Sequence, residues 1–118
     1  MPDRIATGSR DHRALSAEYH SFIKSLNGAC AHRNFLIDAR GIKHPIDCIE
    51  SVYEDERGHV HFRCGHATLH RVFPAPLESY IAAVIKAIEM PESAVAMVDT
   101  TGNAVAIPYT EYLNTYNY

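Results

Sequence analysis

The chain has 118 residues, a length that predicts one folded domain over 1–118. Its apolar fraction of 47% and charged fraction of 21% exclude an intrinsically disordered class. The net charge is −3, distributed as +3 over residues 1–44, −2 over 45–73 and −4 over 74–118, so a nucleic-acid partner, which requires clustered positive charge, is not expected.

The first part of the chain predicts flexible residues over 1–9 and then a helix over 11–27. The apolar residues of this helix fall on one stripe, and Asn27-Gly28 supplies a stop signal. Strands are then expected between turn residues, over 34–38, 42–46, 49–54, 59–64 and 67–73. Pro45 cannot donate a ladder hydrogen bond, so its strand is predicted at a sheet edge.

A second helix over 76–90 has the clearest pattern in the chain. Its apolar residues recur at helical spacing without a miss, and they are Leu77, Tyr80, Ile81, Val84, Ile85 and Ile88. A last hairpin is expected from strands over 94–99 and 103–108. The tail over 109–118 is expected to add a helical turn or two.

The motif Asp-x-x-Gly occurs three times between these strands, at 38–41, 55–58 and 99–102. An aspartate that opens a turn can accept a hydrogen bond from the backbone two residues on, and glycine adopts a positive φ without strain. We therefore expect three hairpin turns. One or two carboxylates in each loop are too few ligands for calcium.

Together these elements predict an α+β fold in two layers. Short turns between strands indicate an antiparallel sheet of hairpins, and the two amphipathic helices are expected to pack on one face of that sheet.

The segment over 59–70 holds five potential metal ligands: His59, His61, Cys64, His66 and His70. If Gly65-His66 forms a two-residue turn, His61 lies opposite His70 and His59 lies opposite Val72. Strand alternation then places three of these four histidines, His59, His61 and His70, on the outer face, within reach of a zinc ion. Phe62, Cys64 and Leu69 face the core in this register, so Cys64 is expected to be a small buried residue and not a ligand.

Other interpretations of this face stay open. Histidine, arginine and glutamate on one strand face are also typical of a solvated or partner-binding surface. If the turn over 55–58 has four residues, Glu54 lies opposite His59 and Glu50 lies opposite Arg63, and both carboxylates join the face. If that turn is shorter, the register slips and Val52 turns to the core.

The tail over 109–118 is rich in tyrosine. Tyr109, Tyr112 and Tyr116 follow helical spacing, and Tyr118 ends the chain. These residues are expected to pack on the sheet or to form a recognition surface, because tyrosine is enriched in interface cores.

The three cysteines, Cys30, Cys48 and Cys64, form no Cys-x-x-Cys motif and are expected to be reduced in a cytoplasmic protein. The start of the chain lacks the apolar segment of a signal peptide, and the apolar run over 81–88 is too short to span a membrane. Arginine outnumbers lysine eight to three, which fits GC-rich coding and a bacterial or phage source.

The segment from Ile46 to Tyr53, continued through Gly65 to Leu77, resembles the sheet of LytTR DNA-binding domains. It shares an acidic-Ile-x-aromatic strand, a hairpin, a glycine turn and a following helix over about 30 residues. The resemblance implies a DNA-binding regulator. The chain departs from the family pattern because no basic recognition segment follows and its last third is acidic.

No phosphate-binding, dinucleotide-binding, zinc-protease or serine-hydrolase motif occurs, so an enzyme is not the first expectation. The sequence favours a small interaction or regulatory protein that binds a protein partner or itself through its sheet face or its tyrosine-rich tail. Small acidic proteins of this kind include inhibitors and immunity factors. Zinc binding and LytTR-like DNA binding are the alternatives.

Overall fold

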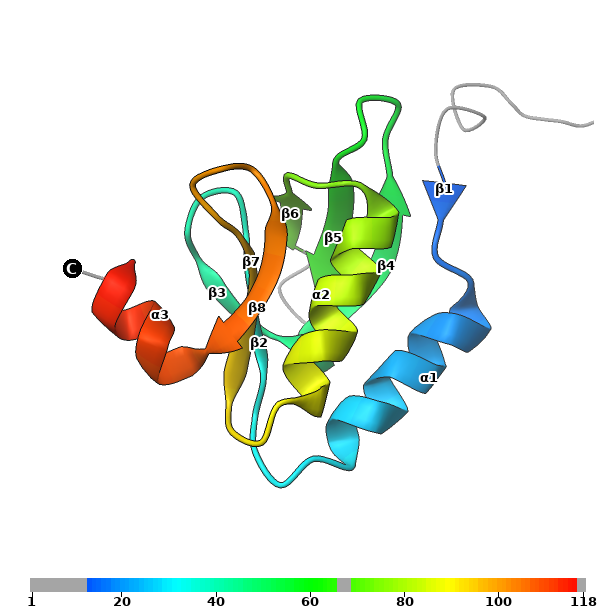
Figure 1. Cartoon of the computed structure of the whole chain (residues 1–118). Coiled ribbons are helices and arrows are strands. Elements are labelled where there is room, and N and C mark those ends of the chain that lie inside the picture. Colours follow the sequence, from blue (N-terminus) through cyan, green and yellow to red (C-terminus); the bar gives the residue numbers. More distant parts are fainter. Residues whose placement is uncertain (1–12, 66–68, 117–118) are drawn as a thin grey trace, which may run out of the picture.

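The computed structural model describes residues 13–65 and 69–116, and Figure 1 shows an α+β protein with two sheets. The α+β class is confirmed, and the helices and strands follow the predicted order. The helices are α1 (Ala17–Gly28), α2 (Leu77–Glu89) and α3 (Tyr109–Thr115). The first helix begins later than predicted because the Ser16 side chain caps it, accepting a hydrogen bond of 3.1 Å from the amide of Tyr19.

The first sheet, sheet A, has the strand order β1-β4-β5-β6, and all its neighbours are antiparallel. Its strands are β1 (Arg13–Ala14), β4 (Ile49–Glu54), β5 (Val60–Cys64) and β6 (Leu69–Phe73). It contains the histidine-rich segment.

The second sheet, sheet B, has the order β3-β2-β7-β8. Its strands are β2 (Phe35–Ile37), β3 (Lys43–Pro45), β7 (Ala94–Val98) and β8 (Ala104–Pro108). Pro45 lies on edge strand β3, as predicted, and β2 pairs with β7 in parallel. A short 3-10 turn, η2 (Ile46–Cys48), separates β3 from β4, and at this point the chain passes from sheet B to sheet A.

All three Asp-x-x-Gly turns form as predicted. The side chains of Asp38, Asp55 and Asp99 each accept backbone hydrogen bonds from residues two and four positions on, at 2.8 to 3.1 Å. The closing glycine of each turn has a φ between 80° and 89°, in the region that favours glycine.

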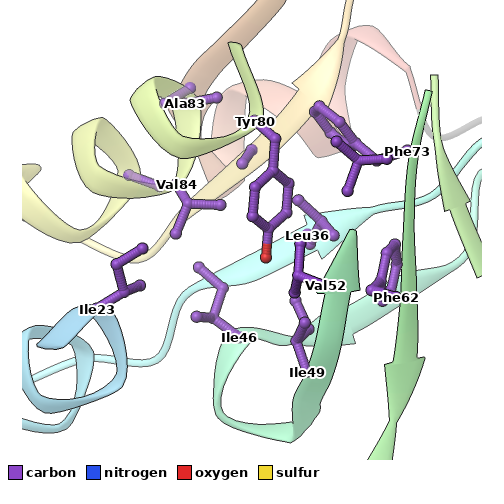
Figure 2. Close-up of a cluster of buried hydrophobic side chains, with 14 of the residues drawn as sticks. Ile23, Leu36, Ile46, Ile49, Val52, Phe62, Phe73, Tyr80, Ala83 and Val84 are labelled. Atoms are coloured by element: carbon purple, nitrogen blue, oxygen red, sulfur yellow. The ribbon is translucent and has the colours of Figure 1, made fainter. Parts of the chain in front are cut away.

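The main core lies between α2 and the two sheets, as Figure 2 shows. Phe62 and Phe73 of sheet A are fully buried, and the ring of Phe73 meets that of Tyr80 on α2 edge-on at 5.7 Å. Sheet B presents small residues to the same helix, namely Ala94, Ala96 and Ala106. Because alanine projects little from a strand, α2 packs closely on this sheet.

Sheet B is buried on its other face as well. Ile37, Val95 and Met97 alternate with the core residues along β2 and β7 and form a second apolar cluster. The short helix α3 contacts β7 and β8 on this side. The third helix therefore covers the sheet face opposite α2.

Candidate functional site

The outer face of sheet A is the side turned away from the core, and none of the described helices lies over it (Figure 1). Its members are exposed or half-buried side chains of three strands: Glu50, Tyr53, His61, Arg63, His70 and Val72. The outer face is taken to include Asp55, at the adjoining turn, as well as these six residues.

The predicted register of the β5–β6 hairpin is wrong by two residues. His61 pairs with Val72 and Arg63 pairs with His70, so four residues, 65–68, connect the strands in place of two. A shift of two keeps every side chain on its predicted side of the sheet. Apolar patterning therefore could not distinguish the two registers, whereas the observed one places Phe73 opposite Val60 in the core.

A β-bulge in β4 explains why the β4–β5 hairpin combines features of both predicted registers. Glu50 lies opposite Arg63 and Val52 is buried, because one extra residue is accommodated between Glu50 and Tyr53. The predicted position of Glu54 opposite His59 is wrong: beyond the bulge the register has shifted by one, so Glu54 pairs with Val60 and is buried. Ser51 has a φ of 54°, which is uncommon for a residue other than glycine. The bulge sets Tyr53 directly opposite His61.

A continuous row of rings crosses the outer face. The ring of Tyr53 stacks on that of His61, with centroids 5.0 Å apart and planes 6° from parallel. His61 Nδ1 lies 2.7 Å from His70 Nε2, and His61 Nε2 lies 2.6 Å from Asp55 Oδ2. The two imidazoles therefore meet at their nitrogen edges, and His61 links the carboxylate to His70.

The carboxylate of Asp55 determines which ring nitrogens of His61 and His70 carry hydrogens. The hydrogen bond from His61, helped by the amides of His59 and Arg57, holds the pKa of Asp55 well below its usual range. An ionised carboxylate only accepts hydrogen bonds, so His61 Nε2–H is the donor. In neutral His61 the Nδ1 atom is then the acceptor for His70 Nε2–H. Burial and the neighbouring His61 and Arg63 lower the pKa of His70, which favours its neutral form.

The structure brings together two of the three predicted zinc ligands. His59 is half-buried beside Val60, its amide bonds to Asp55, and no contact joins its ring to the pair formed by His61 and His70. Across residues 13–65 and 69–116, no three histidine, cysteine, aspartate or glutamate side chains are grouped so that they could hold a metal ion. Zinc binding by His59, His61 and His70 stays a prediction.

A cleft of about 390 Å³ borders the outer face at Tyr53. Leu15 and His20 line it from the start of α1, and Ser51 lines it from the bulge in β4. Burial, and then the charge of Lys24, lower the pKa of His20. The cleft adds a concave, partly apolar site next to the row of rings.

The predicted tyrosine surface lies against the protein's own sheet B. Tyr109, Tyr112 and Tyr116 stack in succession at 6.2 and 5.9 Å, and all three contact the cluster of Ile37, Val95 and Met97. Lys43 Nζ lies 2.8 Å from the Tyr109 hydroxyl. Tyr118 lies outside the described residues. The interface role of the tail stays a prediction, although its rings already contribute to the fold.

One group of interacting polar side chains was missed in the sequence. His44 on β3 lies between Asp38 at the end of β2 and Cys64 on β5, with 2.7 Å from Nε2 to Asp38 Oδ2 and 3.2 Å from Nδ1 to Cys64 Sγ. Cys64 is buried, as predicted, but it has a polar partner. We call Asp38, His44 and Cys64 the thiol network.

The thiol network joins the two sheets, and Arg71 approaches it from β6, with its Nε 3.7 Å from Asp38 Oδ2. Burial alone would raise the pKa of Asp38, but hydrogen bonds from His44 and from the amides of Ile42 and Arg40 outweigh it, so the pKa is lowered. Local spacing gives no signal for this contact. The nearest clue is that His44 lies in a strand, where alternation turns it inward.

No family model, curated protein or solved structure matches this chain. Among the described helices, none combines the length and apolar character needed to cross a membrane.

Proposed function

We propose that this chain is a non-enzymatic interaction protein that associates through the outer face, with a second copy of itself as the partner. The observation that carries the proposal is the ordered row of Tyr53, His61 and His70 on a sheet face that none of the described helices covers. Rings held by neighbours lose little conformational entropy on binding, which favours them as contact residues.

The charges of the outer face are complementary to those of the same face on a second copy. Glu50 and Arg63 are both exposed and lie opposite each other on neighbouring strands. In a two-fold symmetric pair, each residue of one copy contacts the reciprocal residue of the other. Arg63 of one copy can therefore meet Glu50 of its partner, and Val72, half-buried opposite His61 on the edge strand β6, adds an apolar side chain to the contact.

We expect Val72→Glu to abolish self-association, because it replaces an apolar residue of the contact with an unpaired charge. Sedimentation velocity over a concentration series measures the effect. Ser21→Glu, which adds the same charge at an exposed position of α1, is the matched control and should associate like the wild type. A wild-type chain that stays monomeric throughout the series would contradict the proposal.

Zinc binding is the second candidate, and the Asp55–His61–His70 chain favours it. Zinc-binding histidines commonly donate their other ring N–H to a carboxylate, as His61 does to Asp55. Two nitrogens bound to tetrahedral zinc lie about 3.3 Å apart. The His61 and His70 nitrogens, now 2.7 Å apart, need to separate by only a few tenths of an ångström.

Titration calorimetry with zinc and untagged protein tests this candidate. We expect His70→Asn to weaken binding at least tenfold, and His20→Asn, outside the pair, to leave it unchanged. His59→Asn tells whether the third predicted ligand takes part. Equal affinity in the wild type and His70→Asn would rule out a site on the outer face.

DNA binding, which the resemblance to LytTR domains implies, has less support. The outer face sets Glu50 and Asp55 beside Arg63, whereas binding to the phosphate backbone requires a surplus of positive charge.

A further inference from the structure

We propose that Cys64 is a peroxide-reactive thiol, with His44 as its general base and Asp38 as the residue that orients His44. Such a site would allow reversible oxidation of the protein at one position. The proposal does not depend on the outer face, because the thiol network lies on the core side of sheet A.

The geometry is that of an activated nucleophile. A thiol within hydrogen-bond reach of an imidazole, which is in turn held by a third group, is the general arrangement for nucleophilic catalysis by cysteine. Asp38 accepts the Nε2–H of His44 at 2.7 Å, so the Nδ1 atom of neutral His44 is the acceptor that faces Cys64 Sγ at 3.2 Å. The tautomer that removes a thiol proton is therefore the one that Asp38 selects.

Burial restricts the substrate to a small molecule. Cys64 is 9% exposed, and the cleft described above lies against Leu15, Ser51 and Tyr53 instead of the thiol. A peptide or nucleotide could not reach the sulfur without rearrangement, whereas hydrogen peroxide is little larger than water. Burial also raises the pKa of Cys64, so the resting group is a neutral thiol that needs a base at the moment of attack.

The reaction balances without any further reagent. The Cys64 proton passes to His44 Nδ1 as the sulfur attacks one peroxide oxygen. The S–O bond forms, the O–O bond breaks, and the leaving hydroxide takes the proton from His44 and becomes water. Sulfur is oxidised to sulfenic acid by two electrons and the peroxide is reduced.

The chain contains its own comparison thiols. Cys30 and Cys48 are both more exposed than Cys64. The Cys30 thiol lies 3.2 Å from the carbonyl oxygen of Ile88, an acceptor that cannot take its proton. If exposure alone governed reactivity, Cys48 and Cys30 would be oxidised before Cys64.

The test exposes the full chain to hydrogen peroxide for set times, removes the peroxide with catalase, unfolds the protein in urea with dimedone so that every sulfenic acid is accessible for trapping, and measures each cysteine by mass spectrometry. We expect Cys64 of the wild type to be trapped faster than Cys48 and Cys30. We also expect His44→Gln to slow trapping at Cys64 at least tenfold, because general base catalysis is removed.

A purely structural role for the network predicts the opposite change. Loss of His44 would then loosen the site and expose the sulfur, so trapping at Cys64 would become faster. Faster or unchanged trapping in His44→Gln overturns the proposal. If that variant fails to fold, the wild-type order of the three cysteines decides: Cys64 first supports the proposal, and Cys64 last overturns it.

Discussion

Replacing Phe73 with alanine is expected to lower the free energy of unfolding by about 3–5 kcal/mol. Phe73 is fully buried and meets Tyr80 edge-on, so its removal loses apolar burial and leaves a cavity between β6 and α2. Because small domains are stable by only about 5–15 kcal/mol, this variant is expected to be near the limit of folding. Urea denaturation followed by circular dichroism measures the loss.

Phe22→Ala provides the matched control. The Phe22 side chain is 51% exposed on α1, so the same truncation should change the free energy of unfolding by about 0.5 kcal/mol or less. Similar losses at the two positions would contradict the assignment of Phe73 to the core.

Asp38→Ala is expected to cost about 3 kcal/mol, the second largest effect, because it removes one partner from a buried charged network. The carboxylate of Asp38 accepts hydrogen bonds from two backbone amides and from His44. Its loss leaves His44 without an acceptor and Arg71 without its nearby carboxylate. Chemical denaturation at pH 7 measures this cost.

Asp99 offers a close comparison, because its carboxylate makes the same pair of turn hydrogen bonds, to Thr101 and Asn103, in a surface hairpin. Asp99→Ala removes these two bonds and one from the Thr101 hydroxyl at 2.7 Å, but no contact with a buried imidazole, so its destabilisation should be clearly smaller than that of Asp38→Ala. Equal losses would mean that the contact with His44 adds no stability.

The stabilisation by Asp38 is expected to decrease as the pH falls. Its pKa in the folded protein is below that of the unfolded chain, about 3.9 for an aspartate. The stabilisation is therefore complete above about pH 4 and is lost as the pH falls through the folded pKa. The difference in unfolding free energy between the wild type and Asp38→Asn should shrink on acidification; a difference that grows would contradict this sign.

Local patterns were sufficient to predict the elements that depend on local interactions. The apolar spacing of α2 and the three Asp-x-x-Gly turns each depend on contacts within a few residues, and both predictions are confirmed. The edge position of Pro45 was also predictable, because proline has no amide hydrogen to donate to a neighbouring strand.

Contacts between distant strands could not be predicted in the same way. The sequence placed His61 and His70 on one face but not in the correct register, because a shift of two residues preserves the alternation. The division into two sheets depends on the parallel pairing of β2 with β7, which are separated by about half of the chain. The contact between Cys64 and His44 spans 20 residues and both sheets, so neither residue indicated its partner.

The proposal that the outer face is the association surface is tested most directly by an NMR dilution series of the wild-type chain. Amide signals are followed from the highest soluble concentration to a dilution at which the chain is monomeric. We expect the shifts to concentrate on β5 and β6, around His61, Arg63, His70 and Val72. Shifts concentrated on α3 around Tyr112, or none at any concentration, would contradict it.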